Sequence, residues 1–552
     1  MNKKIIAAVS CLCMVSMLFS GCKKNTSVSN EQHKDVVDSN VTKAGEFPVV
    51  KEKITLTLGV PGTPKVQDYE TNAFTKYLEE KTGIDLKFYK FPASGAMEKL
   101  NVMLGSNSEL PEVLIGINVT ENTFLKYADQ EVFLDLTDYI DEYGYYYQQM
   151  LEKTLVENLE GYLTSSNGKK YYMPYLVEQQ GNQYGAKAWI NKKWLDKLNL
   201  KMPETTEDFK NVMKAFKTQD PNGNGKADEI GFTGSKDGWN ESPVNFLTNS
   251  FVYDDYSQKF TVDKNKKVSL AYLSPEYKSA MKYISSMAKE GLLDIQYYTQ
   301  DTKTLKSIAS SDELVIGAFA SGSPDVLFAE NMEVLNDFVP LPPLKGPKNI
   351  AYAAKNPSKP KAAGIITKYC KNPAAAFRLL DFMLSEEASI FARYGVEGKD
   401  WKKASENDKC IFENIGVKAK ILQILPYGSV QNSHWSQNNP QFRFKEIADG
   451  MAWNGNTLDG EYIKAKALTT YMGKEPENVF TKATLTLEEM NEFNELASSI
   501  SPYASENISL FVSGNRDVDK EWDKFQKELK TLGVDRYVEL AQIGYDRFIK
   551  SK

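Results

Sequence analysis

Histidine is almost absent from this 552-residue chain, which has only His33 and His434. A Ser-His-Asp or Cys-His nucleophilic system would therefore depend on His434 alone. The sequence also lacks a Walker loop, a dinucleotide-binding glycine fingerprint and a Cys/His zinc cluster. We therefore predict that the protein is not an enzyme. Glycoside hydrolysis needs only two carboxylates, so composition leaves it open, but no pair stands out.

Long apolar runs are equally scarce. After residue 21 no run approaches the ~20 apolar residues of a membrane-spanning helix. The net charge is −6, and the basic residues are spread along the chain rather than clustered. This distribution argues against nucleic acid as a partner.

Residues 1–21 have the layout of a bacterial export signal. Two lysines precede an apolar core at 5–19, which is too short for a comfortable transmembrane helix. The core ends in LFSGC at 18–22, which resembles the bacterial lipobox with Phe19 where leucine is more usual. The resemblance implies cleavage before Cys22 and a lipid on its thiol, so that the lipid is the protein's only membrane contact. An ordinary secretory signal with Cys22 as a bystander is the alternative.

The next segment, residues 22–50, is polar and shows no apolar period. Such a segment cannot bury enough surface to order itself, so we predict a flexible tether. The remaining body of roughly 500 residues exceeds what one core usually supports, so two or more lobes are expected. For its two cysteines, Cys370 and Cys410, a disulfide and two buried free thiols both stay open.

Strand and helix patterns alternate along the body. We expect strands at 54–60, 85–89, 113–116 and 184–191. Apolar residues at helical spacing predict helices at 72–81, 96–104, 122–128, 207–217 and 372–391, and a mainly helical part from residue 485. The alternation indicates an α/β fold with a parallel sheet covered on both faces. Ligands of such sheets bind beyond the carboxyl ends of the strands, here at 61–66 and 117–120.

Five segments, taken in order, carry a family resemblance: SNSELPEV at 106–113, KYYMPY at 170–175, WINKKWL at 189–195, KNPAAAF at 371–377 and YGVEGKDW at 394–401. They resemble the extracellular family 1 solute-binding proteins, the sugar binders of ABC importers. The last segment resembles the long lipoprotein branch that includes alginate-oligosaccharide binders. In the first segment Glu112 replaces the commoner Asp. The resemblance implies a monomer with a periplasmic-binding-protein-like fold, in which two α/β lobes close by a hinge over a ligand cleft.

The same resemblance implies the domain boundaries. The first lobe would hold residues 51–177 and 358–392, and the second 178–357 and 393–552. The chain would cross between lobes near 175–183, 358–363 and 391–398. A ligand would stabilise the closed state, because only there do both lobes contact it, and ABC permease subunits would recognise that state.

Oxygen-bearing side chains recur at every second position of the loop 220–229, as in an EF-hand, with Gly225 at the turn. Gly231 stands where the EF-hand has its closing Glu. The oxygens would come from the side chains of Asp220, Asn222, Asn224 and Asp228, the carbonyl of Lys226, and a bidentate Glu229. This all-oxygen set predicts a structural calcium ion rather than zinc or copper. A polar Asn-Gly turn is the alternative.

Sugar-binding sites supply flat aromatic rings and planar polar side chains, because sugars present apolar C–H faces and a rim of hydroxyls. Trp239, Trp435 and Trp453 lie in polar, non-periodic contexts, and a half-buried core ring is the alternative for each. At the expected crossings we predict ligand-binding roles for Tyr175, Glu178, Gln179, Gln180, Tyr394 and Glu397. Glu178 is the best single candidate, although a solvated loop acid is the alternative. Arg393 and Arg443 lie near these segments and leave acidic sugars open.

Together these patterns predict a lipid-anchored receptor outside the cytoplasm. It would capture a sugar, in our interpretation an oligosaccharide, and deliver it to an ABC permease. A surface glycosidase with paired carboxylates is one alternative. A peptide-binding or sensor-linked receptor of the same fold is another.

Overall fold

The computed structural model describes residues 36–551, except 312 and 427. The predicted signal peptide and the lipidation site at Cys22 lie outside these residues. Within the described part, no helix is both long enough and apolar enough to cross a membrane.

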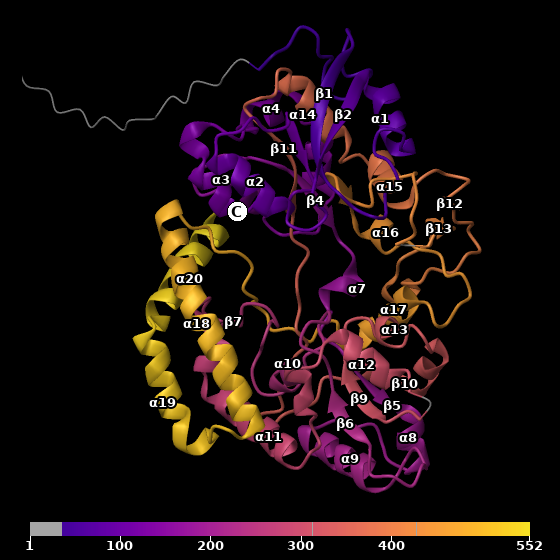
Figure 1. Ribbon diagram of the computed structural model, residues 1–552, viewed down its shortest axis with the longest axis vertical. Helices are drawn as coiled ribbons and strands as arrows, with labels where there is room; N and C mark the ends of the chain where they lie inside the picture. Colours follow the sequence, from indigo (N-terminus) through magenta and orange to yellow (C-terminus); the bar gives the residue numbers. More distant parts are fainter. Residues whose placement is uncertain (1–35, 312, 427, 552) are drawn as a thin grey trace, which may run out of the picture. The chain divides into compact units, whose positions relative to one another are not determined.

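A six-stranded sheet forms the first lobe, with the strand order β14-β4-β11-β3-β1-β2 (Figure 1). Its strands are β1 (Ile54–Pro61), β2 (Ile84–Phe91), β3 (Val113–Ile115), β4 (Met173–Val177), β11 (Lys361–Ile366) and β14 (Gln441–Arg443). The pairs β1–β2 and β1–β3 are parallel, as predicted, and β4–β14 is parallel too, but β11 is antiparallel to both neighbours. The sheet is therefore mixed, because β11 enters from the opposite lobe.

Helices cover both faces of this sheet. Successive side chains of a strand point to opposite faces, and accordingly Val113 and Ile115 lie in one core while Leu114 lies in another. The first core is covered by α1 (Ala73–Thr82), α4 (Thr137–Tyr143), α5 (Tyr145–Lys153), α6 (Leu159–Leu163), α14 (Pro373–Phe382) and α15 (Glu386–Tyr394). The second core is covered by α2 (Ala96–Gly105) and α3 (Glu121–Lys126).

The second lobe is built on a four-stranded sheet with the order β10-β5-β9-β6. Its strands are β5 (Ala188–Asn191), β6 (Ile230–Thr233), β9 (Ile316–Ala320) and β10 (Phe338–Leu341). Around them lie α8 (Lys192–Lys197), α9 (Thr206–Thr218), α10 (Pro243–Thr248), α11 (Pro275–Lys289), α12 (Thr302–Ala309), α13 (Pro324–Leu327) and α17 (Gly460–Tyr471), with the hairpin β7 (Phe260–Val262) and β8 (Val268–Leu270). Thr205 caps α9 in a capping box, and Phe209, Val212, Met213 and Phe216 are buried, as their spacing predicted.

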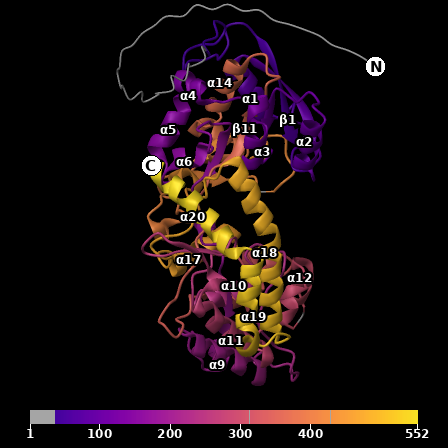
Figure 2. The same ribbon diagram turned by 90° about the vertical axis from the view of Figure 1, so that its left-hand side faces the viewer.

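Three C-terminal helices run beside the second lobe: α18 (Leu487–Ser513), α19 (Val518–Thr531) and α20 (Val534–Lys550). They lie side by side in Figure 2, and α18 and α19 both pack against α11. At its other end the bundle contacts the first lobe. There Asn158 Nδ2 donates to the Phe548 carbonyl at 2.7 Å, and Asn122 Nδ2 donates to Asn491 Oδ1 at 3.2 Å.

The domain boundary that we predicted at residue 393 is wrong. Strand β14 and the fully buried Trp435 belong with the first lobe. After Arg443 the chain leaves that lobe through α16 (Lys445–Ala448), and not at 391–398, and near the C-terminus Phe548 of α20 packs back into the first-lobe core. The sequence concealed this return because β14 has only three residues, too few for a recognisable strand period.

The prediction of a flexible tether up to residue 50 is also wrong for its last part. Val41, Val49 and Val50 are buried against the first lobe, and Val41 bridges to Val50. Arg378 donates to the carbonyls of Lys43 at 2.8 Å and Glu46 at 2.6 Å. A few valines suffice to hold this segment, although its average composition is polar.

The helix predicted at 372–391 is two helices, α14 and α15. Ser385 interrupts the pattern and caps α15, because its hydroxyl accepts a hydrogen bond from the Ala388 amide. Within the described residues both cysteines are free thiols, and they lie in different lobes: Cys370 against the first-lobe core and Cys410 in the second-lobe core.

Candidate functional site

Three crossings connect the lobes: β4 to α7 (Gln180–Gln183) and β5, β10 to β11, and β14 to α16 and α17. Two cavities flank these crossings and share Gln183, Pro357 and Ser358 in their walls. Side chains of the first crossing alternate between them: Tyr175, Val177 and Gln179 face one cavity, whereas Glu178 faces the other.

One cavity has a volume of about 490 Å3 and a largely basic wall. We call it the cationic cavity. Its charged lining residues are Lys359, Lys361, Arg393, Arg443, Lys464 and Glu461, and its uncharged polar or aromatic ones include Tyr175, Gln179, Asn182, Asn356, Tyr394 and Gln437. Because these residues come from both lobes and from all three crossings, a molecule bound here would contact every part that moves in a hinge closure.

Hydrogen bonds fix the polar groups of the first-lobe wall. Arg443 donates through Nε to Gln441 Oε1 at 3.0 Å and also to the side-chain oxygens of Gln437 and Tyr175. Ser436 and Gln437 both have left-handed backbone, with φ of 54° and 65°, which is uncommon for residues other than glycine. This strained turn aims Gln437 at Arg443 and Tyr175.

The opposite wall carries a smaller polar network on α17. Glu461 accepts a hydrogen bond from Gln179 Nε2 at 3.1 Å and pairs with Lys464 at 2.7 Å. The Lys464 ammonium also lies 5.8 Å from the ring centroid of Trp239, which is 46% exposed. Burial, together with the Lys464 charge, lowers the pKa of the neighbouring Lys187 to about 7.

The structure places the predicted ligand-binding residues unequally. Tyr175, Gln179 and Tyr394 line the cationic cavity, and Trp239 adjoins it through Lys464. Tyr394 is 2% exposed, and its hydroxyl has no hydrogen-bond partner among the described residues. Trp453 stacks on Tyr462 at 4.9 Å between ring centroids and lines neither cavity.

The structure places two predicted ligand-binding residues away from both cavities. Trp435 is 0% exposed, packs edge-on against Phe74 and Phe88, and donates its indole N–H to Thr75 Oγ1 at 2.8 Å. Its polar sequence context belongs to the loop that follows, not to the ring. Glu397 lies on the surface beside Lys403, 3.8 Å away, and lines neither cavity.

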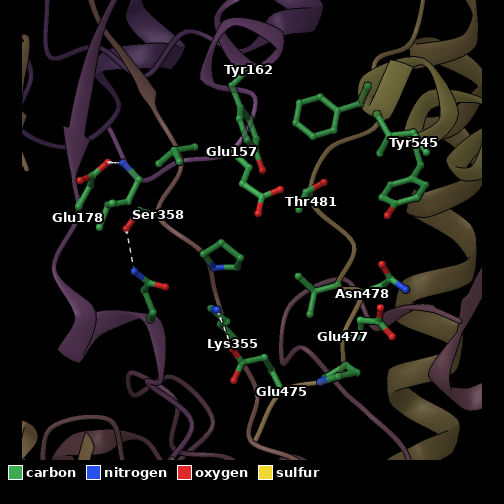
Figure 3. Close-up of a pocket in the computed structure, with 18 of the residues that line it drawn as sticks. Glu157, Tyr162, Glu178, Lys355, Ser358, Glu475, Glu477, Asn478, Thr481 and Tyr545 are labelled. Carbon is green, nitrogen blue, oxygen red and sulfur yellow. Dashed lines mark hydrogen bonds and ion pairs between the residues drawn. The ribbon is translucent and has the colours of Figure 1, made fainter. Parts of the chain in front are cut away.

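The second cavity has a volume of about 550 Å3 and carries four glutamates, Glu157, Glu178, Glu475 and Glu477, against Lys266 and Lys355. We call it the acidic cavity. Figure 3 shows Glu157, Glu475 and Glu477 around the space between the first crossing and α20, which contributes Tyr545. Glu475 pairs with Lys355 at 2.7 Å and accepts the Tyr184 hydroxyl at 2.8 Å, so it ties two crossings to the chain before α18.

Glu178 is 1% exposed and serves the crossing itself rather than the cationic cavity. Its carboxylate accepts Thr154 Oγ1 at 2.6 Å and the Leu155 amide at 2.8 Å. Burial raises its pKa. Gln180, also predicted to face the ligand, lines the acidic cavity, and its amide donates to the buried Asp449 at 3.1 Å.

The loop 220–229 is held by hydrogen bonds from its backbone amides to Asp220. Asp220 accepts the amides of Gly223, Asn224 and Gly225 within 3.1 Å. Glu229 is 2% exposed, neither carboxylate oxygen has a hydrogen-bond partner in the described part of the chain, and burial raises its pKa. No three His, Cys, Asp or Glu side chains of the described residues converge into a metal cluster. The set of oxygen donors therefore fits calcium only if side-chain amide and backbone carbonyl oxygens are included. A bound cation would compensate the negative charge of the buried Glu229 carboxylate.

Comparisons with known proteins define the family. The family described as bacterial extracellular solute-binding protein matches residues 63–390. This chain belongs to that family. A fructooligosaccharide ABC transporter substrate-binding protein, FusA of Streptococcus pneumoniae, is 26% identical over 528 residues, 92% of each chain. Lipoprotein LipO of Bacillus subtilis is 26% identical over 417 residues, 73% of this chain and 74% of LipO.

Solved structures give the same fold. The EF-hand mutant of S. pneumoniae FusA, in complex with fructo-nystose, superposes with a TM-score of 0.71 at 22% identity, covering 90% of this chain and all of that one. The predicted family and the predicted two-lobed, periplasmic-binding-protein-like fold are therefore confirmed.

Sequence reasoning missed part of the cationic cavity. Lys359 and Lys361 lie in the second crossing, which was predicted near its actual place, and the alternation of exposed side chains there would have marked them. Glu461 and Lys464 lie on α17, whose amphipathic pattern is weak and gave no signal.

Proposed function

We propose that this protein is a lipid-anchored receptor outside the cytoplasm that captures an oligosaccharide and delivers it to an ABC permease, without turning it over. The observation that carries the proposal is the cationic cavity. Aromatic rings and planar amide, guanidinium and carboxylate groups from both lobes line it, which is the equipment that sugar hydroxyls and C–H faces require.

The relatives support the transport role. FusA is described as an ABC transporter substrate-binding protein for fructooligosaccharide, and LipO as a lipoprotein. The predicted lipid on Cys22 would keep the receptor near its permease at high local concentration.

Hinge closure supplies the signal for the permease. Gln179 and Tyr175 belong to a crossing, Gln437 and Arg443 to the first lobe, and Glu461 to the second. A ligand that contacts all of them binds the closed state more tightly and shifts the equilibrium toward it. The permease subunits would select that state.

A calcium ion in the loop 220–229 would be structural. The ion would be held by the side chains of Asp220, Asn222, Asn224, Asp228 and Glu229 and by the Lys226 carbonyl. Its positive charge would compensate the buried Glu229 carboxylate, which has no hydrogen-bond partner in the described chain. The EF-hand described for FusA supports this assignment. None of these residues lines either cavity, so calcium would order the lobe rather than contact the ligand.

Calorimetry against a panel of oligosaccharides and peptides tests the proposal, with a reducing-end assay on the same samples. We expect binding of at least one oligosaccharide without release of new reducing ends. Sustained release would establish the glycosidase alternative instead. Binding of peptides alone would establish a peptide receptor of the same fold.

A further inference from the structure

The charge of the cationic cavity is unbalanced. Five basic residues line it, from the second crossing, α15, β14 and α17, against one lining carboxylate, Glu461. That carboxylate is already engaged, because Lys464 pairs with it at 2.7 Å. Closing the lobes over a neutral ligand would therefore trap several like charges in a space with little water, which costs free energy.

Arg443 is the first basic group without an acidic partner. It is 6% exposed, so water compensates its charge only in part. Its hydrogen bonds go to neutral oxygens of Gln437, Gln441 and Tyr175, and no ion pair with a carboxylate is present among the described residues. Buried guanidinium groups are normally paired, and their planar fork matches a carboxylate or sulfate.

Lys359 is the second basic group of this cavity without an acidic partner. It lies half-buried in the second crossing, and within the described chain it makes no hydrogen bond or ion pair. Burial lowers its pKa, and the charge of Asp255 opposes this shift. The carboxylate of Asp255 accepts hydrogen bonds from the amides of Ser257 and Lys259, so it is directed elsewhere.

We propose that the captured ligand is an acidic oligosaccharide, whose carboxylate or sulfate groups pair with Arg443 and Lys359. The inference rests on the proposed function and narrows its ligand to an anionic class. Tyr175, Gln179 and Gln437 would then bind hydroxyls between the charged groups, and closure would neutralise the cavity instead of concentrating its charge.

Calorimetry on the full-length protein in detergent micelles tests the inference. The panel holds uronate-containing oligosaccharides, their carboxyl-reduced counterparts of identical linkage, and sulfated oligosaccharides. We expect at least one acidic member to bind 10-fold or more tightly than its reduced counterpart, with an advantage that shrinks from 50 to 500 mM NaCl. A preference for sulfated over carboxylated members would support the same class and identify the anion.

Equal or tighter binding of the reduced, neutral members would overturn the inference and leave the receptor function standing. Binding of no member of this panel, with binding of a neutral oligosaccharide of the first panel, would also overturn the inference alone, and binding of no oligosaccharide of either panel would overturn both.

Matched variants distinguish the loss of a charge that pairs with the ligand from a general loss of binding. Lys359→Gln should lower affinity for the acidic ligand about 10-fold and leave affinity for a neutral one nearly unchanged. Lys361→Gln, at an exposed lysine of the same cavity, should have a smaller effect. Lys266→Gln, at an exposed lysine of the acidic cavity, is the control and should change neither. An equal loss of both ligands in Lys359→Gln would contradict the pairing.

Discussion

The two cavities that flank the crossings share part of one wall and differ in how their charges are used. In the acidic cavity Lys355, Glu475 and Tyr184 satisfy one another and tie two crossings to the chain before α18. In the cationic cavity Arg443 contacts neutral oxygens, and Lys359 contacts no polar partner in the described chain. We interpret this contrast as a division of roles: one side of the crossings holds the chain together, and the other, on our proposal, keeps its charges available for a ligand.

The largest expected effect is a loss of ligand affinity when a charge is removed from the cationic cavity but not when one is removed from the acidic cavity. Arg443→Gln should weaken binding about 30-fold or more, because it removes a buried charge that the ligand would pair. Glu477→Gln, in the acidic cavity, should change affinity less than about 2-fold, since Glu477 is exposed. Calorimetry measures both, and circular dichroism verifies that each variant is folded. Equal losses in the two variants would erase the distinction between the cavities.

Calcium should raise the stability of the folded protein and leave its affinity for the ligand unchanged. At calcium concentrations 100 times the dissociation constant, the folded state should gain about 2.7 kcal/mol, and EDTA should remove that gain. Thermal unfolding with and without EDTA measures it.

Asp220→Asn and Glu229→Gln should lose the calcium response. Asp263→Asn, in a similar Asx turn between β7 and β8, is the control and should keep it. If ligand affinity fell together with the calcium response, the loop would have a role in the site that the structure does not place there.

The Lys355–Glu475 pair should contribute to stability rather than to binding. Lys355→Met should lower the free energy of unfolding by about 1 kcal/mol, because both side chains are only partly exposed, 27% and 17%. Lys348→Met breaks a more exposed pair with Glu276 and should cost less. Denaturant unfolding measures both variants. A loss of affinity in Lys355→Met without a loss of stability would place the ligand in the acidic cavity and contradict the proposed site.

The smallest effect concerns His434, whose loop supplies Gln437 to the cationic cavity. Burial, with the Arg393 charge as a second cause, lowers the pKa of His434 to about 4. The folded imidazole stays neutral while the unfolded one gains a proton below its ordinary pKa of 6.5. Its contribution to stability is therefore fully present above pH 6.5 and is lost as the pH falls toward 4.

Histidine NMR titration, assigned with His434→Gln, should show one ring that titrates near pH 4. The variant should also lose part of the decline in melting temperature between pH 6.5 and 4. A ring at 434 that titrates near 6.5 would contradict the buried, desolvated environment of this side chain.

Local patterns predicted part of the fold. The strands β1, β2 and β3 and the helix α9 appeared because their apolar periods are complete within ten or so residues. The pairing of β14 with β4 did not, because their union depends on segments more than 260 residues apart in the chain. The packing of Val41, Val49 and Val50 into the first-lobe core was missed for the same reason, since their partners lie in helices distant in the sequence.

The site was predictable only in outline. Tyr175, Gln179 and Tyr394 could be placed near the crossings, but which side of a crossing a residue faces depends on register. Glu178 shows this limit, because a shift of one position separates it from Gln179. Trp435 shows another, since a polar neighbourhood in sequence does not determine whether a ring is buried.

A crystal structure of the protein with a bound oligosaccharide tests the central claim most directly. We expect the sugar in the cationic cavity, in contact with Tyr175, Gln179 and Arg443 from one wall and with Glu461 or Lys464 from the other. A sugar bound among Glu157, Glu475 and Glu477 would contradict it.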